Sequence, residues 1–259
     1  MLADFKTSLW LLKLGALVNL YFLVSTLAPP ASAASAHILV PAQIFFAVSA
    51  FRCLFPVGYK HNVVFHDSPL SSIFLTRLLA TFSEVAYIYQ LSHVIRLLNA
   101  DQVGWIDALS WVMVVQVVVS QCFVWSAILT GRLVLYFFEE LGWAIIFVAN
   151  TTASAYLYLT LDTFGGREVL VHLSLLFGSV YLPWQVVHLR LQLSDAKRGA
   201  QAGNPVTPVA EGLARSLRER NPTTAAEAWG GLVGLSWMTG YWATLTPMWI
   251  HYVVVVLSR

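Results

Sequence analysis

The sequence predicts an all-α fold: a polytopic integral membrane helical bundle of about seven transmembrane helices. Of the 259 residues, 58% are hydrophobic and only 11% are charged, whereas a soluble domain carries about 25% charged residues. The apolar residues also form long continuous runs. A β-barrel would require alternation along each strand, so helices are the favoured way to satisfy the backbone in lipid.

Seven apolar runs reach the length of about 20 residues that a helix needs to cross a bilayer. We predict a single transmembrane domain over residues 1–259, with the hydrophilic segment 194–228 as a loop between the last two spans. Within that loop, the run VAEGLARSLRER is expected to form a short surface helix. The predicted spans are residues 8–28, 37–57, 70–98, 105–129, 133–159, 169–193 and 229–257.

The first span has two interpretations. Lys6 and Lys13 lie on its N-terminal side and the small-residue run PPASAASA follows it, which also fits a cleavable signal peptide. An uninterrupted apolar stretch of ~20 residues favours a membrane anchor over the shorter core of a signal peptide.

Basic residues near span ends predict the orientation, because short cytoplasmic loops carry an excess of Lys and Arg. The segment 194–228 is the most basic connector, and alternation from it places the N-terminus inside and the C-terminus outside. The connector 58–67 and the connector after the fourth span are then also cytoplasmic. The basic residues of segment 194–228 are Lys197, Arg198, Arg215, Arg218 and Arg220.

Five ionisable residues lie within predicted spans: Arg52 in the second, Arg77 and Glu84 in the third, and Glu139 and Glu140 in the fifth. In the predicted orientation Arg77 is roughly 10 Å from the cytoplasmic end of its span, at 1.5 Å per residue. Glu139 and Glu140 lie at a similar depth, and Arg52 lies near the same side. We therefore expect these four residues to form one layer in the cytoplasmic third of the membrane.

Two interpretations of this layer remain open. In the first, Arg52 or Arg77 pairs with Glu139 or Glu140 and holds the second, third and fifth spans together, or an arginine extends its head group toward the interface. In the second, the layer and Glu84 line a polar cavity for an ion, a proton or a lipid headgroup. Glu84 shares a helix face with Arg77 but has no basic residue within one turn, so its carboxyl group is expected to favour the neutral, proton-exchanging form.

One more polar residue belongs with the candidates. Asn150 follows Glu139 by eleven residues, which places both on one helix face. Adjacent Glu139 and Glu140 point about 100° apart on a helix, so both cannot face one narrow seam. The candidate ligand or ion pathway residues are Arg52, Arg77, Glu84, Glu139, Glu140 and Asn150.

Known catalytic and metal-binding motifs were not found, so no catalytic residue, metal ligand or cofactor is assigned. No two histidines have the spacing of a zinc helix, and nucleotide-binding glycine motifs are missing. The expected partners are the lipid bilayer and other membrane proteins, and a net charge of +2 is too small to indicate nucleic acid. We favour a transport, channel or sensing role over two alternatives: a lipid-active enzyme whose arginines hold a phosphate headgroup, and an accessory subunit of a larger complex.

Overall fold

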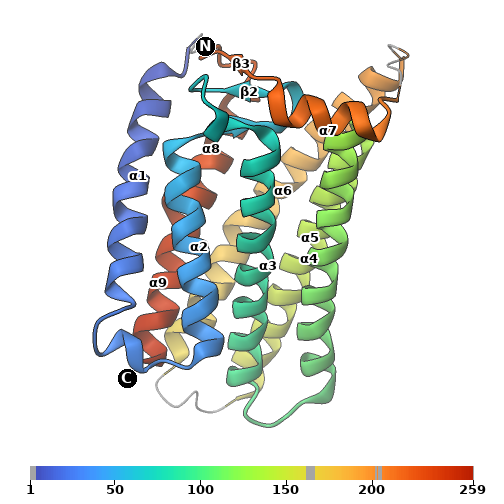
Figure 1. Cartoon of the computed structure of the whole chain (residues 1–259). Helices are drawn as coiled ribbons and strands as arrows, with labels where there is room; N and C mark the ends of the chain where they lie inside the picture. The colour runs from blue at the N-terminus through green and yellow to red at the C-terminus, as the bar shows by residue number, and fades with distance from the viewer. Residues whose placement is uncertain (1–3, 162–166, 202, 204–205, 259) are drawn as a thin grey trace. The chain divides into compact units, whose positions relative to one another are not determined.

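The protein is an all-α helical bundle, as predicted, and the computed structural model describes residues 4–161, 167–201, 203 and 206–258 (Figure 1). The chain divides into two compact units. Unit 1 comprises Met1–Glu84, Ile128–Gly131 and Val206–Arg259, and unit 2 comprises Val85–Ala127 and Arg132–Pro205. The long helices are α1 (Lys6–Ser25), α2 (Ala36–Leu54), α3 (Ile73–Leu98), α4 (Gly104–Thr130), α5 (Val134–Thr160) and α6 (Glu168–Gln201).

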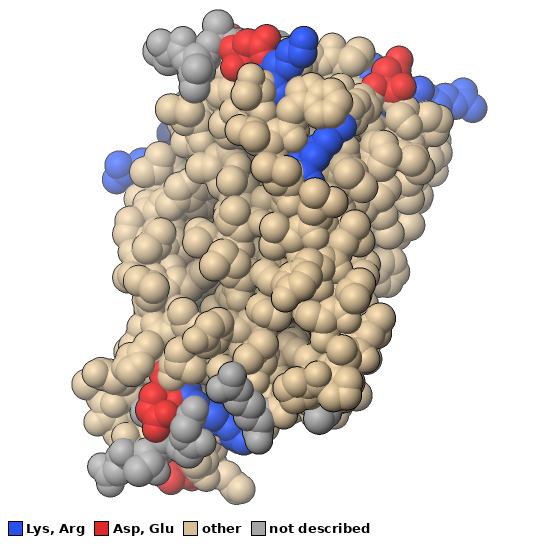
Figure 2. Space-filling model, turned by 90° about the vertical axis from the view of Figure 1, so that its left-hand side faces the viewer, with Lys and Arg blue, Asp and Glu red and all other residues tan. Residues whose placement is uncertain are grey.

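Six helical stretches among the described residues are long and apolar enough to cross a membrane: α1, α2, α4, α5, α6 and Gly231–Leu257. The 26-residue helix α3 is not in this set, because charged side chains interrupt its apolar sequence. Large apolar side chains are exposed along the spans, among them Leu11, Leu17 and Val24 of α1. Figure 2 shows a face on which uncharged side chains predominate over Lys, Arg, Asp and Glu. Such a surface suits lipid rather than water.

The last span is interrupted rather than continuous. It consists of α8 (Gly231–Met238), the π-helical turn η4 (Thr239–Ala243) and α9 (Leu245–Leu257). Pro247 lies in the first turn of α9 and has no backbone N–H, so it cannot donate to a carbonyl of the preceding turn. The sequence predicts one span over residues 229–257, and the π-helical turn within it is not part of that prediction.

Helix α1 packs against this interrupted span and α2 at a glycine. A Cβ atom added at Gly15 would lie 2.5 Å from the Cβ of Ala243 and 3.1 Å from the Sγ of Cys53. Only glycine allows the backbones to approach this closely.

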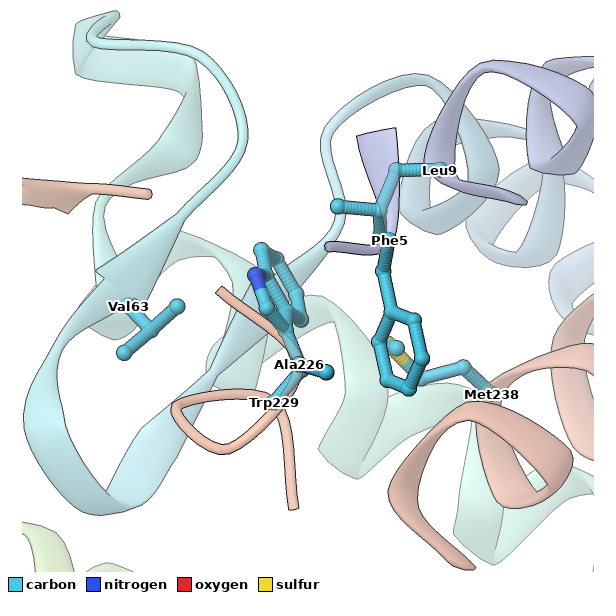
Figure 3. Close-up of a cluster of buried hydrophobic side chains, with 6 residues drawn as sticks. All are labelled: Phe5, Leu9, Val63, Ala226, Trp229 and Met238. Carbon is cyan, nitrogen blue, oxygen red and sulfur yellow. The ribbon is translucent and has the colours of Figure 1, made fainter. Parts of the chain in front are cut away.

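Three segments distant in sequence meet at one end of unit 1. The short strands β1 (Val57–Gly58) and β2 (Val63–Val64) pair antiparallel, and β2 pairs in parallel with β3 (Asn221–Pro222). Asp4 forms a β-bridge with Ala225, which joins the start of the chain to the same end. Beneath these strands, buried side chains from α1, β2, α8 and the residues after β3 converge (Figure 3). The cluster consists of Phe5, Leu9, Val63, Ala226, Trp229 and Met238.

The opposite ends of α1 and α9 are also joined. The hydroxyl of Ser258 donates to the carbonyl oxygen of Ala31 at 3.3 Å, so the end of α9 meets the connector between α1 and α2.

The predicted surface helix is present as α7 (Val209–Arg218). Its Gly212 packs against the carbonyl of Leu129, one of the last residues of α4 that belong to unit 1. Arg215 donates to the carbonyl oxygen of Ile128 at 3.2 Å, and a basic side chain is a favourable partner for carbonyls at a helix C-terminus. Leu213 and Leu217, each one residue after the buried Gly212 and Ser216, are exposed.

In unit 2, α6 is longer than the sequence predicted. The predicted end was residue 193, whereas the helix continues to Gln201 and has 34 residues. At 1.5 Å per residue this gives about 51 Å, well beyond the roughly 30 Å of a hydrocarbon core. The first part of the predicted loop is therefore helical.

Candidate functional site

Arg77 and Glu84 form a buried ion pair within α3. The Nη2 atom of Arg77 lies 2.6 Å from Oε2 of Glu84, and Nη1 lies 3.2 Å from Oε1. Residues seven apart share a helix face, as the sequence analysis expected, and the two contacts give the strong bidentate geometry. No basic residue lies within one turn of Glu84, as the sequence indicates, but the long side chain of Arg77 reaches its carboxylate across two turns.

Arg52 lies in the last turn of α2 and its side chain is buried between aromatic rings. Its Cζ atom is 5.1 Å from the ring centroid of Tyr59 and 5.1 Å from that of Trp242. The Cζ atom of Arg77 lies 5.5 Å from the same Tyr59 ring. The two guanidinium groups therefore share one aromatic neighbour, within the range of cation–π attraction.

The π-helical turn η4 positions Trp242 beside Arg52. The carbonyl oxygen of Trp242 accepts a hydrogen bond from Nδ2 of Asn19 at 2.9 Å and one from Sγ of Cys53 at 3.5 Å. The Trp242 ring also stacks on Phe45 of α2, with centroids 5.9 Å apart. Single π-helical turns occur frequently at functional sites, and here the turn brings an indole against a buried charge.

Several buried polar atoms around Arg52 have no hydrogen-bond partner among the described residues. They are Nε and Nη1 of Arg52, Oγ of Ser49 and Nε1 of Trp242. Ser49 precedes Arg52 by three residues on α2, so both lie on one face of the helix. We refer to Ser49, Arg52, Tyr59, Arg77, Glu84 and Trp242 as the Arg52 cluster. Two guanidinium groups and one carboxylate leave this cluster with one positive charge in excess.

The other three predicted residues belong to unit 2. The Glu140 carboxylate accepts a hydrogen bond from Nε2 of Gln185 at 3.0 Å and lies 3.1 Å from Nε2 of His188. The backbone carbonyl of Glu139 accepts from the Ser120 hydroxyl at 3.3 Å. Asn150 is buried, and its Oδ1 has no hydrogen-bond partner in the described part of the chain. The predicted layer thus comprises two groups in different units, and its existence as one site stays a prediction.

Sequence reasoning missed several residues of these groups, Ser49 among them. Tyr59 is in a predicted connector and Trp242 in a predicted regular span, so neither was connected with the arginines. Gln185 and His188 are three apart on α6 and face Glu140 together. That spacing is visible in the sequence, although their partner on α5 becomes evident only from the packing.

Comparison with protein-family models, curated proteins and solved structures found no match for this chain. Among the described residues, no three His, Cys, Asp or Glu side chains are grouped as metal ligands would be. The chemistry of the site therefore has to be inferred from its own residues.

Proposed function

We propose that the protein is a seven-span membrane protein with a transport or sensing role, in which α3 is the seventh span. Its 26 residues give about 39 Å of helix, enough to cross a hydrocarbon core. We further propose that the N-terminus is cytoplasmic and the C-terminus external. In support, the segments around Asp4, β1–β2 and β3, all predicted to be cytoplasmic, meet at one end of unit 1. Ser258 meets the predicted external connector instead.

The observation that carries the functional proposal is the burial of Arg52, Arg77 and Glu84. The exposed fractions of these three residues are 2%, 1% and 1%. Arg52 lies on α2, and Arg77 and Glu84 lie on α3. Buried charges are costly, and apolar residues of similar size hold helices together equally well or better. Ionisable groups inside a membrane commonly mark substrate or ion pathways. A functional role therefore explains the burial of these charged residues better than helix packing does.

The geometry provides a switchable element. A proton bound by Glu84, or an anion that competes for Arg77, would weaken the pair and favour a second arrangement of the two side chains. A ligand shifts such an equilibrium only through different affinities for the two arrangements. An ion pair within one helix, next to a second buried arginine, can therefore couple binding to a change in α3.

The test uses purified protein reconstituted into liposomes, with a voltage-sensitive dye and an internal pH dye as readouts. We expect an ion or proton flux that Glu84→Gln abolishes and that Glu84→Asp, which keeps the charge, retains in part. Glu211→Gln removes a carboxylate from an exposed position on α7 and is expected to leave the flux unchanged. Equal flux or ligand response from the wild type and a folded Glu84→Gln variant would refute the proposal.

A further inference from the structure

We propose that the Arg52 cluster binds an oxyanion, a phosphate or carboxylate group, that accepts hydrogen bonds from Arg52. This inference rests on the proposed function in naming the class of ligand that the cluster takes. The contacts that support it lie within unit 1, and binding of the anion is measured independently of flux.

Arg52 carries a buried positive charge. Its residue is only 2% exposed, and its Nε and Nη1 have no hydrogen-bond partner among the described residues. The rings of Tyr59 and Trp242 and the negative end of the α2 dipole stabilise the charge in part. None of these accepts a hydrogen bond from Nε or Nη1, and buried charges are normally both paired and hydrogen-bonded.

The buried atoms of Arg52, Ser49 and Trp242 that have no partner among the described residues all belong to groups that can donate hydrogen bonds. The indole Nε1 of Trp242 can only donate, a guanidinium has no acceptor, and the hydroxyl of Ser49 can donate. All three groups contain buried atoms without a partner in the described part of the chain. The ionised oxygens of a carboxylate or phosphate group are acceptors and so fit this set, whereas a bound cation would add to the excess of positive charge.

The charge and geometry of the Arg52 cluster indicate which oxyanions fit. The excess of one positive charge matches a singly charged group, such as a carboxylate, a dihydrogen phosphate ion or the phosphodiester of a lipid headgroup. The planar guanidinium presents its donors in a geometry that suits carboxylate and phosphate oxygens. A soluble anion and a lipid headgroup offer the same chemistry, so the experiment has to separate the two sources.

The experiment measures thermal unfolding of the purified, delipidated protein in neutral detergent as sodium phosphate replaces sodium chloride at constant ionic strength. A ligand that binds the folded state raises the Tm progressively with its concentration. We expect a rise of several degrees in the wild type, its loss in Arg52→Gln, and a smaller rise in Arg52→Lys. Arg218→Gln removes an exposed arginine from the same unit and should respond as the wild type does.

A second arm repeats the measurement in nanodiscs of phosphatidylcholine, with and without phosphatidylglycerol. Stabilisation by phosphatidylglycerol but not by phosphate, again dependent on Arg52, identifies a lipid headgroup as the ligand. If neither anion raises the Tm, or if Arg52→Lys and Arg52→Gln respond as fully as the wild type, the proposed site is wrong. Anion binding without flux would leave this inference standing and reject the transport role, and flux without anion binding would do the reverse.

Discussion

Arg77 and Glu84 illustrate at the residue scale how a buried ion pair constrains substitution. Loss of one partner leaves a buried charge and typically costs about 3–5 kcal/mol. We expect Glu84→Gln to lower the Tm, and the double variant Arg77→Met with Glu84→Gln to cost less than the sum of the two single changes. The four proteins of this double-mutant cycle are compared by thermal unfolding in detergent, and strictly additive effects would contradict the pairing.

His66 gives a pH dependence at the same scale. It lies in the connector between α2 and α3, and burial lowers the pKa of its imidazole, assisted by the positive charge of Lys13. The unfolded chain therefore binds a proton at a higher pH than the folded protein does. The contribution of neutral His66 to stability is complete above the ordinary histidine pKa of about 6.5 and is lost as the pH falls toward the lowered value.

We accordingly expect the Tm of the wild type to fall more steeply on acidification below about pH 6.5 than that of His66→Gln, since only the wild type takes up this proton on unfolding. The measurement is the Tm of both proteins from neutral pH to pH 5, where the difference between the two curves isolates His66. Parallel curves would show that the folded protein does not disfavour the charged imidazole.

At the scale of elements, α7 depends on one glycine. A Cβ atom at Gly212 would lie 1.8 Å from the carbonyl oxygen of Leu129, so a side chain there forces α7 away from the end of α4. We expect Gly212→Val to reduce stability by about 1–3 kcal/mol, as overpacking usually does. Ala214→Val, at an exposed position on the same helix, serves as the control in thermal unfolding and should differ little from the wild type.

The π-helical turn η4 depends on Asn19. Its Nδ2 donates to the carbonyl oxygens of Gly15 and Trp242 at 2.8 and 2.9 Å. Asn19→Ala leaves the Trp242 carbonyl with only the weak thiol donor of Cys53, and a poorly satisfied buried group costs up to about 1–3 kcal/mol. Since η4 positions Trp242 beside Arg52, we expect both a lower Tm and a weaker response to phosphate. A lower Tm with an unchanged phosphate response would show that η4 does not contribute to phosphate binding.

The elements were predictable where hydrophobicity alone determines them. The apolar runs predicted α1, α2, α4 and α5 to within a few residues at most ends, because the length and composition of a span determine a helix in lipid. The extension of α6 to Gln201 has no apolar signal, and the π-helical turn in the last span depends on Asn19, which is distant in sequence. The hydrophobicity pattern of one segment gives no information on its contacts with residues distant in sequence.

The site was predictable to a smaller extent. Arg52, Arg77 and Glu84 stand out because charges are rare in apolar runs, and the shared face of Arg77 and Glu84 follows from helical periodicity. The aromatic neighbours Tyr59 and Trp242 come from a connector and from the last span, and Glu140 meets His188 only through the packing of α5 on α6. These partners depend on which helix faces meet, and hydrophobicity does not distinguish among the alternatives.

At the scale of the whole molecule, the proposed topology predicts which residues react from each side of the membrane. After replacement of Cys53 and Cys122 by Ala, we expect Ser35→Cys to react with a membrane-impermeant maleimide added outside intact cells. Ala214→Cys should react only after the membrane is permeabilised, because α7 is proposed to be cytoplasmic. The reverse labelling pattern would show that the orientation in the membrane is opposite to the one proposed. Labelling of both cysteines from outside would contradict the span count.

The most direct test of the central claim is an experimental structure of the protein in lipid nanodiscs at a resolution that shows ordered ligands. The account predicts density for a phosphate or carboxylate group, with oxygens about 2.7–3.2 Å from Nε or Nη1 of Arg52, the usual hydrogen-bond range. A protein carboxylate bonded to Arg52, or ordered water alone at these nitrogens, would contradict it.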